Sequence, residues 1–241
     1  MAMTPSLSAL RIAIFADGAD RAAMLEAARH PLIRGLTTNP SLMRKAGVTD
    51  YAAFGREMAA LIPHLPISFE VIADDLPGMA RQARIIASWG PQVFVKLPVT
   101  TTAGESILPI IPELVAEGVR LNITALFTPE QVAPISAALG DRVPAFLSVF
   151  AGRIADTGRD PLPILREVLA IMAPRPNQRL IWASPREVLN LFQADAIGCH
   201  AITMTHDLLA KLPLIGRDLL AFSRETVQMF HRDAQAAGFT L

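Results

Sequence analysis

The chain has little cysteine, little lysine and no long apolar run. Cys199 is the single cysteine among 241 residues, which excludes an intrachain disulfide and suits a reducing cytoplasm. Proline, arginine or an acidic residue interrupts every apolar stretch before it reaches the roughly 18 residues of a membrane span. Residues 1–11 also lack the basic and apolar pattern of a signal peptide. We therefore expect a cytoplasmic protein with no membrane partner.

The sequence also lacks an excess of charge of either sign. It carries 22 basic and 22 acidic residues, and this balance argues against a broad nucleic-acid-binding surface. Recognition of an anion must then be local, through a few placed arginines. The five histidines show no ligand-like spacing with cysteine or carboxylates, so no metal site is expected.

Only three of the basic residues are lysines, and one of them has unusual neighbours. Lys45 and Lys211 fall in segments typical of amphipathic helices, whereas Lys96 lies within Val-Phe-Val-Lys-Leu-Pro-Val, a run typical of a buried strand. An ammonium group amid apolar neighbours is costly to keep charged, so the neutral amine becomes available for Schiff-base chemistry. The alternative is that Lys96 reaches water from a strand end or pairs with a buried carboxylate.

Short apolar segments alternate with segments of helical period along the whole chain. The predicted strands are 11–17, 33–38, 66–73, 93–99, 120–127, 145–151, 179–184 and 201–205. The predicted helices are 20–29, 50–61, 77–88, 106–116, 129–139, 160–172, 185–193 and 217–237. Eight such alternations predict an α/β protein with a closed parallel sheet. We expect a single (β/α)8 TIM-barrel domain over residues 1–241, with an extra C-terminal helix at about 216–238.

Polar residues gather where the predicted strands end, and in such barrels this is where the chemistry lies. They are Asp17, Thr37, Thr38, Asn39, Glu70, Lys96, Asn122, Thr124, Ser148, Arg153, Ser184 and Arg186. The alternative is that strand-end polar residues cap the following helices, and capping is the better interpretation for Ser184 taken alone. It does not account for Lys96, Glu70 and Asn122, which lie inside apolar strands.

Four segments resemble the transaldolase family. They are 35–42 (GLTTNPSL), 93–98 (VFVKLP), 121–128 (LNITALFT) and 148–156 (SVFAGRIAD). The resemblance runs in order from about residue 13 to residue 212, and the first two segments together are quite specific. The length is similar to that of the short members, which include transaldolases and fructose 6-phosphate aldolases.

The resemblance implies a reaction on sugar phosphates that needs no metal or organic cofactor. Lys96 would attack the C2 ketone of a ketose phosphate to form an iminium, and Asp17 would remove the C4 hydroxyl proton. Cleavage would leave a dihydroxyacetone enamine on Lys96 for transfer to an aldose phosphate. Glu70 and Thr124 would hold the water used in forming and hydrolysing the iminium. Central pentose phosphate metabolism is the default pathway, and a dedicated sugar biosynthesis is the alternative.

Two positions bear on transfer against simple cleavage. At these two positions this chain has Glu70 and Phe150, the residue types of the transaldolases that it resembles, whereas the fructose 6-phosphate aldolases tend to have Gln and Tyr. An enamine without a nearby proton donor survives until an acceptor arrives, which favours transfer; ordinary core packing is the alternative for Phe150. A lyase of the fructose 6-phosphate aldolase type remains the alternative activity. A deoxyribose-phosphate aldolase would need a second lysine in the pocket, and none is evident. A barrel that binds sugar phosphates without converting them would not need this combination of catalytic residues.

The resemblance also implies which residues bind the substrate. Arg186 with Ser184, and Arg153, would bind phosphate, helped by a helix expected to start at Pro185. The family usually has Ser-Phe-Arg-Asn here and this chain has Ser-Pro-Arg-Glu, which leaves the acceptor sugar open. For Arg153 the alternative is an ion pair with Asp156 or Asp160. The remaining candidates for contact with sugar hydroxyls or for shaping the loop are Asn39, Asn122, Ser148, Thr37 and Thr38.

The segment 216–238 is predicted to be a long amphipathic helix. In short family members such a helix packs against a neighbouring subunit, so we expect a homo-oligomer. The alternative is that the helix covers its own barrel.

Overall fold

The computed structural model describes residues 6–240 and consists of a closed barrel of eight parallel strands in the order β1 to β8. Residues 1–5, part of the stretch examined for a signal peptide, and residue 241 lie outside the described residues. The strands are β1 (Ala13–Asp17), β2 (Ile33–Thr37), β3 (Ile67–Glu70), β4 (Val93–Pro98), β5 (Leu121–Leu126), β6 (Ala145–Val149), β7 (Gln178–Trp182) and β8 (Ala201–Thr205). The predicted (β/α)8 TIM barrel is confirmed.

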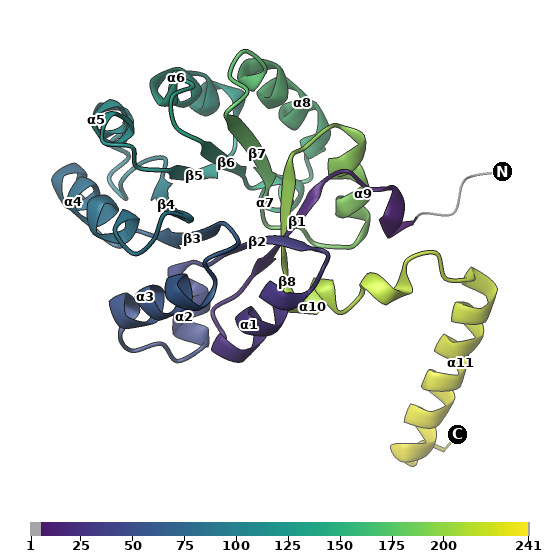
Figure 1. Cartoon of the computed structure of the whole chain (residues 1–241). Coiled ribbons are helices and arrows are strands. Elements are labelled where there is room, and N and C mark those ends of the chain that lie inside the picture. Colours follow the sequence, from purple (N-terminus) through teal and green to yellow (C-terminus); the bar gives the residue numbers. More distant parts are fainter. Residues whose placement is uncertain (1–5, 241) are drawn as a thin grey trace.

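Helices surround the barrel on its outer side (Figure 1). The α-helices are α1 (Arg21–Arg29), α2 (Pro40–Lys45), α3 (Tyr51–Leu61), α4 (Leu76–Ala87), α5 (Ile111–Ala116), α6 (Pro129–Leu139), α7 (Ala151–Ala155), α8 (Pro161–Met172), α9 (Leu189–Ala196), α10 (His206–Leu209) and α11 (Leu219–Ala236). Three short 3-10 helices complete the set: η1 (Leu7–Ala9), η2 (Leu108–Ile110) and η3 (Leu212–Leu214). Aspartate side chains accept backbone N–H groups at the starts of α1, α3, α4, α8 and α11.

The barrel interior is apolar near the amino ends of the strands, its lower part, and polar near their carboxyl ends, its upper part. Phe15, Phe94 and Phe146 pack together near the amino ends of the strands, with the Phe15 and Phe146 rings edge to face at 5.5 Å. Two residues further along β1 and β4 lie Asp17 and Lys96. Because side chains alternate along a strand, each of these polar residues points to the same side as the phenylalanine below it. The aromatic layer is therefore the floor of the polar region.

The structure differs from the predicted elements in two helices. The predicted helix at 106–116 is divided into η2 and α5, because Pro109 and Pro112 each lack the N–H that a continuous α-helix would use. The helix predicted at 185–193 begins only at Leu189. Upstream of it, the side chain of Asn190 accepts the backbone N–H groups of Arg186 and Glu187, which holds this segment as a turn. The expectation that a helix starts at Pro185 is therefore wrong.

Three short α-helices were not predicted from the sequence. Helices α2, α7 and α10 each follow a strand almost directly, on the side of the barrel where the strands end. They are only 6, 5 and 4 residues long, too short for a periodic apolar pattern to become visible.

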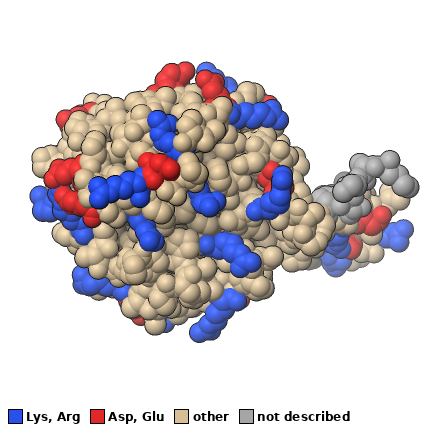
Figure 2. All heavy atoms as spheres, turned by 45° about the horizontal axis from the view of Figure 1, so that its top comes forward, with Lys and Arg blue, Asp and Glu red and all other residues tan. Residues whose placement is uncertain are grey.

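The C-terminal helix α11 is present, and it projects away from the barrel (Figure 1). None of its residues is buried, and Leu220 and Phe230 are 80% and 63% exposed. The alternative that this helix covers its own barrel is wrong. Within residues 6–240 no helix is both long and apolar enough to span a membrane. On the face drawn in Figure 2, acidic and basic side chains are interspersed with uncharged surface.

Replacement of Gly35 by alanine should destabilise the barrel beneath the polar region. A Cβ atom on Gly35 would lie 2.6 Å from Cζ of the buried Phe15 ring. We expect the free energy of unfolding to fall by about 1–3 kcal/mol, the usual cost of overpacking a core. Urea denaturation measures this change.

The matched control makes room for the added methyl group. Phe15→Leu alone should also cost stability, but Gly35→Ala with Phe15→Leu should cost less than the sum of the two single changes. Strictly additive losses would show that the Phe15 ring is not what excludes a side chain at position 35.

Candidate active site

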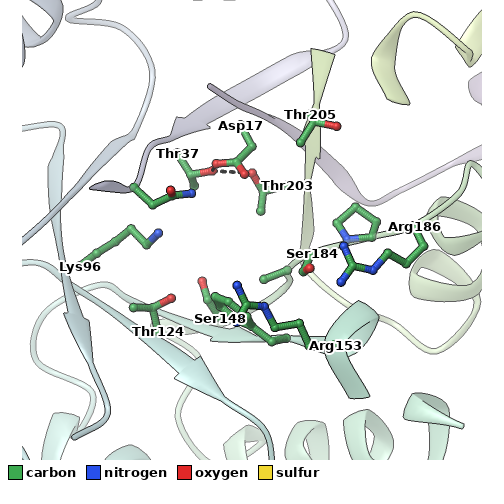
Figure 3. Close-up of a pocket in the computed structure, with 14 residues that line it drawn as sticks. Asp17, Thr37, Lys96, Thr124, Ser148, Arg153, Ser184, Arg186, Thr203 and Thr205 are labelled. Atoms are coloured by element: carbon green, nitrogen blue, oxygen red, sulfur yellow. Dashed lines mark hydrogen bonds between the residues drawn. The ribbon is translucent and has the colours of Figure 1, made fainter. Parts of the chain in front are cut away.

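A cavity of about 150 Å³ opens at the carboxyl ends of the strands. Ten of the thirteen candidate residues line it: Asp17, Thr37, Asn39, Lys96, Thr124, Ser148, Phe150, Arg153, Ser184 and Arg186. In Figure 3, Lys96 points into the cavity from one side, and Arg153 and Arg186 lie on the opposite side. The other three do not line the cavity wall, but each contacts a residue that does. Glu70 and Thr38 contact Lys96, and Asn122 contacts Ser148.

Lys96 lies in the middle of β4 and its residue is 6% exposed. Its Nζ atom is 3.1 Å from Oε2 of Glu70, on the neighbouring strand β3, and donates to the carbonyl oxygen of Thr38 at 2.9 Å. The pairing with a carboxylate, given above as the alternative to a catalytic role, is thus present together with the position on the cavity wall. An amine beside a carboxylate has an acceptor for its proton at hand, so the two interpretations are compatible.

Glu70 is held by the only tyrosine in the chain. The Tyr51 hydroxyl, at the start of α3, donates to the carbonyl oxygen of Glu70 at 2.6 Å and accepts the Glu70 N–H at 2.8 Å. Burial raises the pKa of Tyr51 above its usual value, so the hydroxyl stays protonated and remains a donor. The backbone of Glu70 is fixed from behind, and its carboxylate is aimed at Lys96. Sequence reasoning missed Tyr51, which lies 19 residues before its partner.

Asp17 ends β1 and lies at the top of the cavity in Figure 3. Burial raises its pKa above the usual aspartate value, and the nearby Glu70 charge adds to this effect. Lys96, the Thr37 hydroxyl and His206 act in the opposite direction. Thr37 donates to Oδ1 of Asp17 at 2.6 Å, so Asp17 is held by a hydrogen bond from the adjacent strand.

A line of polar groups runs below the cavity on β5, β6 and β3. Ser148 lines the cavity and donates to Oδ1 of Asn122 at 2.7 Å, while Nδ2 of Asn122 donates to Ser68 at 3.1 Å. Asn122 is fully buried, so the structure places it beneath Ser148 rather than on the cavity wall. Thr124 lies on the wall, and its hydroxyl oxygen is buried without a hydrogen-bond partner among the described residues.

Thr38 and Asn39 connect β2 to α2. The Thr38 side chain donates to the carbonyl oxygen of Ser68, so Thr38 faces the neighbouring strand and offers Lys96 only its own carbonyl oxygen. Asn39 accepts the backbone N–H of Leu42 through Oδ1 and thereby caps α2. Asn39 also lines the cavity, so it combines the capping role with a position at the site.

The opposite wall carries two arginines with different partners. Arg186 makes a two-pronged ion pair with Asp156, with its Nε atom 3.0 Å from Oδ1, and this pairing holds the pKa of Asp156 below its usual value. Arg153 lies over the ring of Phe150, with its guanidinium carbon 5.3 Å from the ring centre. Asp156 therefore pairs with Arg186, and Arg153 makes no ion pair within residues 6–240.

A close backbone approach brings the two arginines together. A Cβ atom on Gly152 would lie 1.6 Å from the carbonyl oxygen of Ser184, so only glycine permits this contact between α7 and the β7–α9 loop. Ser184 adopts φ of 58°, in the left-handed region. It caps no helix, which differs from the capping interpretation, and instead lines the cavity beside Arg186.

The site contains two threonines whose contacts the sequence analysis did not identify. Thr37 was expected among the strand-end polar residues and to shape a loop, and Thr203 was not singled out. Their hydroxyl oxygens are 2.5 Å apart inside the barrel, next to Asp17. The sequence did carry a signal, since Thr203 and Thr205 lie two positions apart, on one side of an otherwise apolar strand.

Comparisons with known proteins show the family of this chain. The family described as Transaldolase/Fructose-6-phosphate aldolase matches residues 14–241. A protein of Dehalococcoides mccartyi named "Probable transaldolase" is 34% identical over 200 residues, which are 83% of this chain and 89% of that protein. Proteins of the same name from a Roseiflexus and an Anaeromyxobacter species are 36% and 34% identical, covering 76% and 86% of this chain and 82% and 94% of their own lengths. The chain belongs to the transaldolase/fructose-6-phosphate aldolase family.

Proposed function

We propose that this protein is a transaldolase that transfers a dihydroxyacetone unit from a ketose phosphate to an aldose phosphate through a Schiff base on Lys96. The observation that carries the proposal is the position of Lys96. It is a buried amine on the wall of a cavity, with a carboxylate at 3.1 Å, an aspartate on a neighbouring wall and two arginines opposite. Fructose 6-phosphate and sedoheptulose 7-phosphate are the proposed donors, in cytoplasmic carbohydrate metabolism.

The first step requires a neutral amine. Glu70 is the nearest carboxylate to Lys96 and can accept its proton, after which Nζ attacks the C2 carbonyl carbon of the ketose. The carbonyl oxygen leaves as water once it has been protonated, and the iminium remains. The unpartnered hydroxyl of Thr124 and the Glu70 carboxylate can together hold that water.

The second step breaks the C3–C4 bond. Asp17 takes the proton of the C4 hydroxyl, the C3–C4 electron pair moves toward the iminium nitrogen, and an aldose phosphate is released. The enamine left on Lys96 attacks the aldehyde carbon of the acceptor, and Asp17 returns its proton to the new hydroxyl group. Water then hydrolyses the iminium and frees the product.

Arg153 and Arg186 are the proposed phosphate ligands, with Ser184 between them. A guanidinium group offers a planar fork of donors that matches phosphate oxygens. Asp156 occupies the fork of Arg186, so a bound phosphate must share or displace this partner. Ser148 and Asn39 are proposed to contact sugar hydroxyls, and Asn122 to support Ser148 from below.

A lyase that releases dihydroxyacetone is the second candidate. It needs a proton donor beside the enamine carbon, and the family's aldolases tend to have a tyrosine at the position of Phe150. Here Phe150 packs between Phe127 and Arg153 and offers no proton. Transfer is therefore the favoured activity.

Replacement of Lys96 by arginine should abolish the activity. The assay follows glyceraldehyde 3-phosphate release from fructose 6-phosphate, with and without erythrose 4-phosphate. The wild type should release it only with the acceptor and form sedoheptulose 7-phosphate, while Lys96→Arg should lose more than about 1,000-fold in kcat because arginine cannot form the imine.

Lys211→Arg is the matched control, since this exposed lysine lies outside the cavity. It should keep wild-type activity. Turnover by Lys96→Arg would contradict the covalent mechanism, and sustained release without an acceptor would identify a lyase instead.

The raised pKa of Asp17 should appear in the pH dependence of kcat. Asp17 must be ionised to accept the hydroxyl proton, so the rate should fall as the pH is lowered through its pKa. Burial raises that pKa, so the acid limb should lie above the value of about 3.9 found for a free aspartate. Measurement of kcat at saturating substrate between about pH 4 and about pH 9 tests this, because an unshifted aspartate would titrate at the lower end of that range. A limb at the unshifted value, or none, would argue against Asp17 as the base.

We also propose that α11 packs against a neighbouring subunit. Its 18 residues span about 27 Å, and its apolar side chains are exposed: Leu219, Leu220, Phe222, Val227, Met229 and Phe230. An exposed apolar surface of this length on a single helix is typical of an association surface.

A charge placed on the apolar side of α11 should dissociate the oligomer. We expect Phe230→Glu to lower the molar mass measured by sedimentation equilibrium. Gln228→Glu adds the same charge on the opposite, polar side of the helix and should leave the mass unchanged. Equal masses for wild type and Phe230→Glu would show that this surface does not hold the subunits together.

A further inference from the structure

The hydrogen bonds around Asp17 continue one residue further, into the barrel interior. Asp17 on β1 accepts from Thr37 on β2, and the Thr37 hydroxyl lies 2.5 Å from that of Thr203 on β8. Strands β2 and β8 are the two neighbours of β1, so the three hydrogen-bonded side chains come from three adjacent strands. In Figure 3 the three side chains lie together, at a distance from the arginines.

The number of protons fixes the direction of these bonds. A threonine hydroxyl has one proton to donate, and an ionised carboxylate can only accept. Thr37 gives its proton to Asp17, so Thr203 must be the donor in the contact between the two threonines. The resulting order is Thr203 to Thr37 to Asp17.

Both threonines are buried residues on the cavity wall, and the side-chain hydrogen bonds they make are to each other and to Asp17. Thr37 and Thr203 are 3% and 6% exposed. Thr203 pairs in register with Phe15, whose ring belongs to the apolar floor of the cavity. Hydrogen bonds in such a region are stronger than in water, and each donor polarises the next.

We propose that Thr203 is a positioning residue for the proton transfer, a role that rests on the proposed function of Asp17 as the base. By donating to Thr37, Thr203 keeps the single Thr37 proton directed at the Asp17 carboxylate. This arrangement leaves the Asp17 carboxylate lone pair that faces the cavity free to accept the proton of the substrate hydroxyl.

The chain also fits the return of the proton. When Asp17 has taken the hydroxyl proton on the lone pair that faces the cavity, its Oδ1 can still accept from Thr37, and Thr37 can still accept from Thr203. The order of the hydrogen bonds is therefore kept, and the proton taken from the substrate stays on Asp17 until the new aldol is made. The same three groups can therefore serve cleavage and addition.

Removal of the Thr203 hydroxyl should destabilise the ionised form of Asp17 more than the neutral form, since hydrogen bonds to a charged acceptor are stronger than those to a neutral one. Three other titratable groups act on Asp17, namely Lys96, Glu70 and His206. They lie on β4, β3 and α10, and a change at Thr203 leaves all three in place.

The test follows the Asp17 carboxyl directly, by carbon NMR of the full-length protein labelled at its aspartates, with Asp17→Asn for assignment. Thr203→Val should move the titration midpoint of Asp17 upward by about 0.5 pH, which corresponds to about a threefold loss of the ionised form at a fixed pH below the midpoint. Thr203→Ser keeps the donor and should restore the wild-type midpoint. Thr203→Ala provides a second hydroxyl-free variant in case the valine variant folds poorly.

Thr101→Val is the matched control for the loss of a buried threonine hydroxyl elsewhere in the chain. The Thr101 side chain accepts the N–H of Glu105, so its removal should cost stability without moving the Asp17 midpoint. An unchanged midpoint in both Thr203→Val and Thr203→Ala would overturn the proposal.

The acid limb of kcat adds a second readout, which should shift upward with the midpoint in Thr203→Val. The titration needs no turnover, so it separates this proposal from the proposed function. A shifted midpoint in a protein without transaldolase activity would refute the reaction and leave the hydrogen-bond chain standing. A shifted midpoint with an unshifted limb in an active enzyme would overturn the role of Thr203 in proton transfer.

Discussion

The site depends on keeping one amine inside the barrel. A lysine surrounded by the apolar residues of β4 would be costly to ionise, and here the cost is offset by the Glu70 carboxylate at 3.1 Å and the Thr38 carbonyl oxygen at 2.9 Å. Glu70 is in turn fixed by the Tyr51 hydroxyl through both backbone hydrogen bonds. We propose that the same carboxylate which stabilises the ammonium takes its proton when a ketone arrives, so that stability and reactivity would have one source.

Two kinds of support surround this amine. Beneath it, the packed rings of Phe15, Phe94 and Phe146 exclude water from the lower barrel and leave the polar groups facing upward. On the far wall, the absence of a side chain at Gly152 lets the Ser184 carbonyl approach closely and brings Arg186 to the cavity. A molecule with no net charge thus carries two arginines, Arg153 and Arg186, on the cavity wall where a phosphate is expected.

The sequence predicted the barrel, because eight apolar strands with helical segments between them allow few other folds. It also located Lys96, since a charged residue in an apolar strand has few explanations, and ten of the thirteen candidate residues lie on the cavity wall. It failed where the local pattern is short or the contact is distant. The start of α9 depends on the Asn190 side chain, and the roles of Tyr51 and Thr203 depend on contacts 19 and 166 residues apart. Such contacts follow from the closed barrel, not from any local spacing.

The most direct test of the account is to trap the covalent intermediate. The protein is incubated with fructose 6-phosphate and reduced with borohydride, which converts an iminium to a stable secondary amine, and the modified peptide is identified by mass spectrometry. With only three lysines in the chain, the assignment is unambiguous. The account predicts a reduced dihydroxyacetone adduct on Lys96 and none on Lys45 or Lys211. An active protein that yields no adduct, or an adduct confined to another lysine, would contradict it.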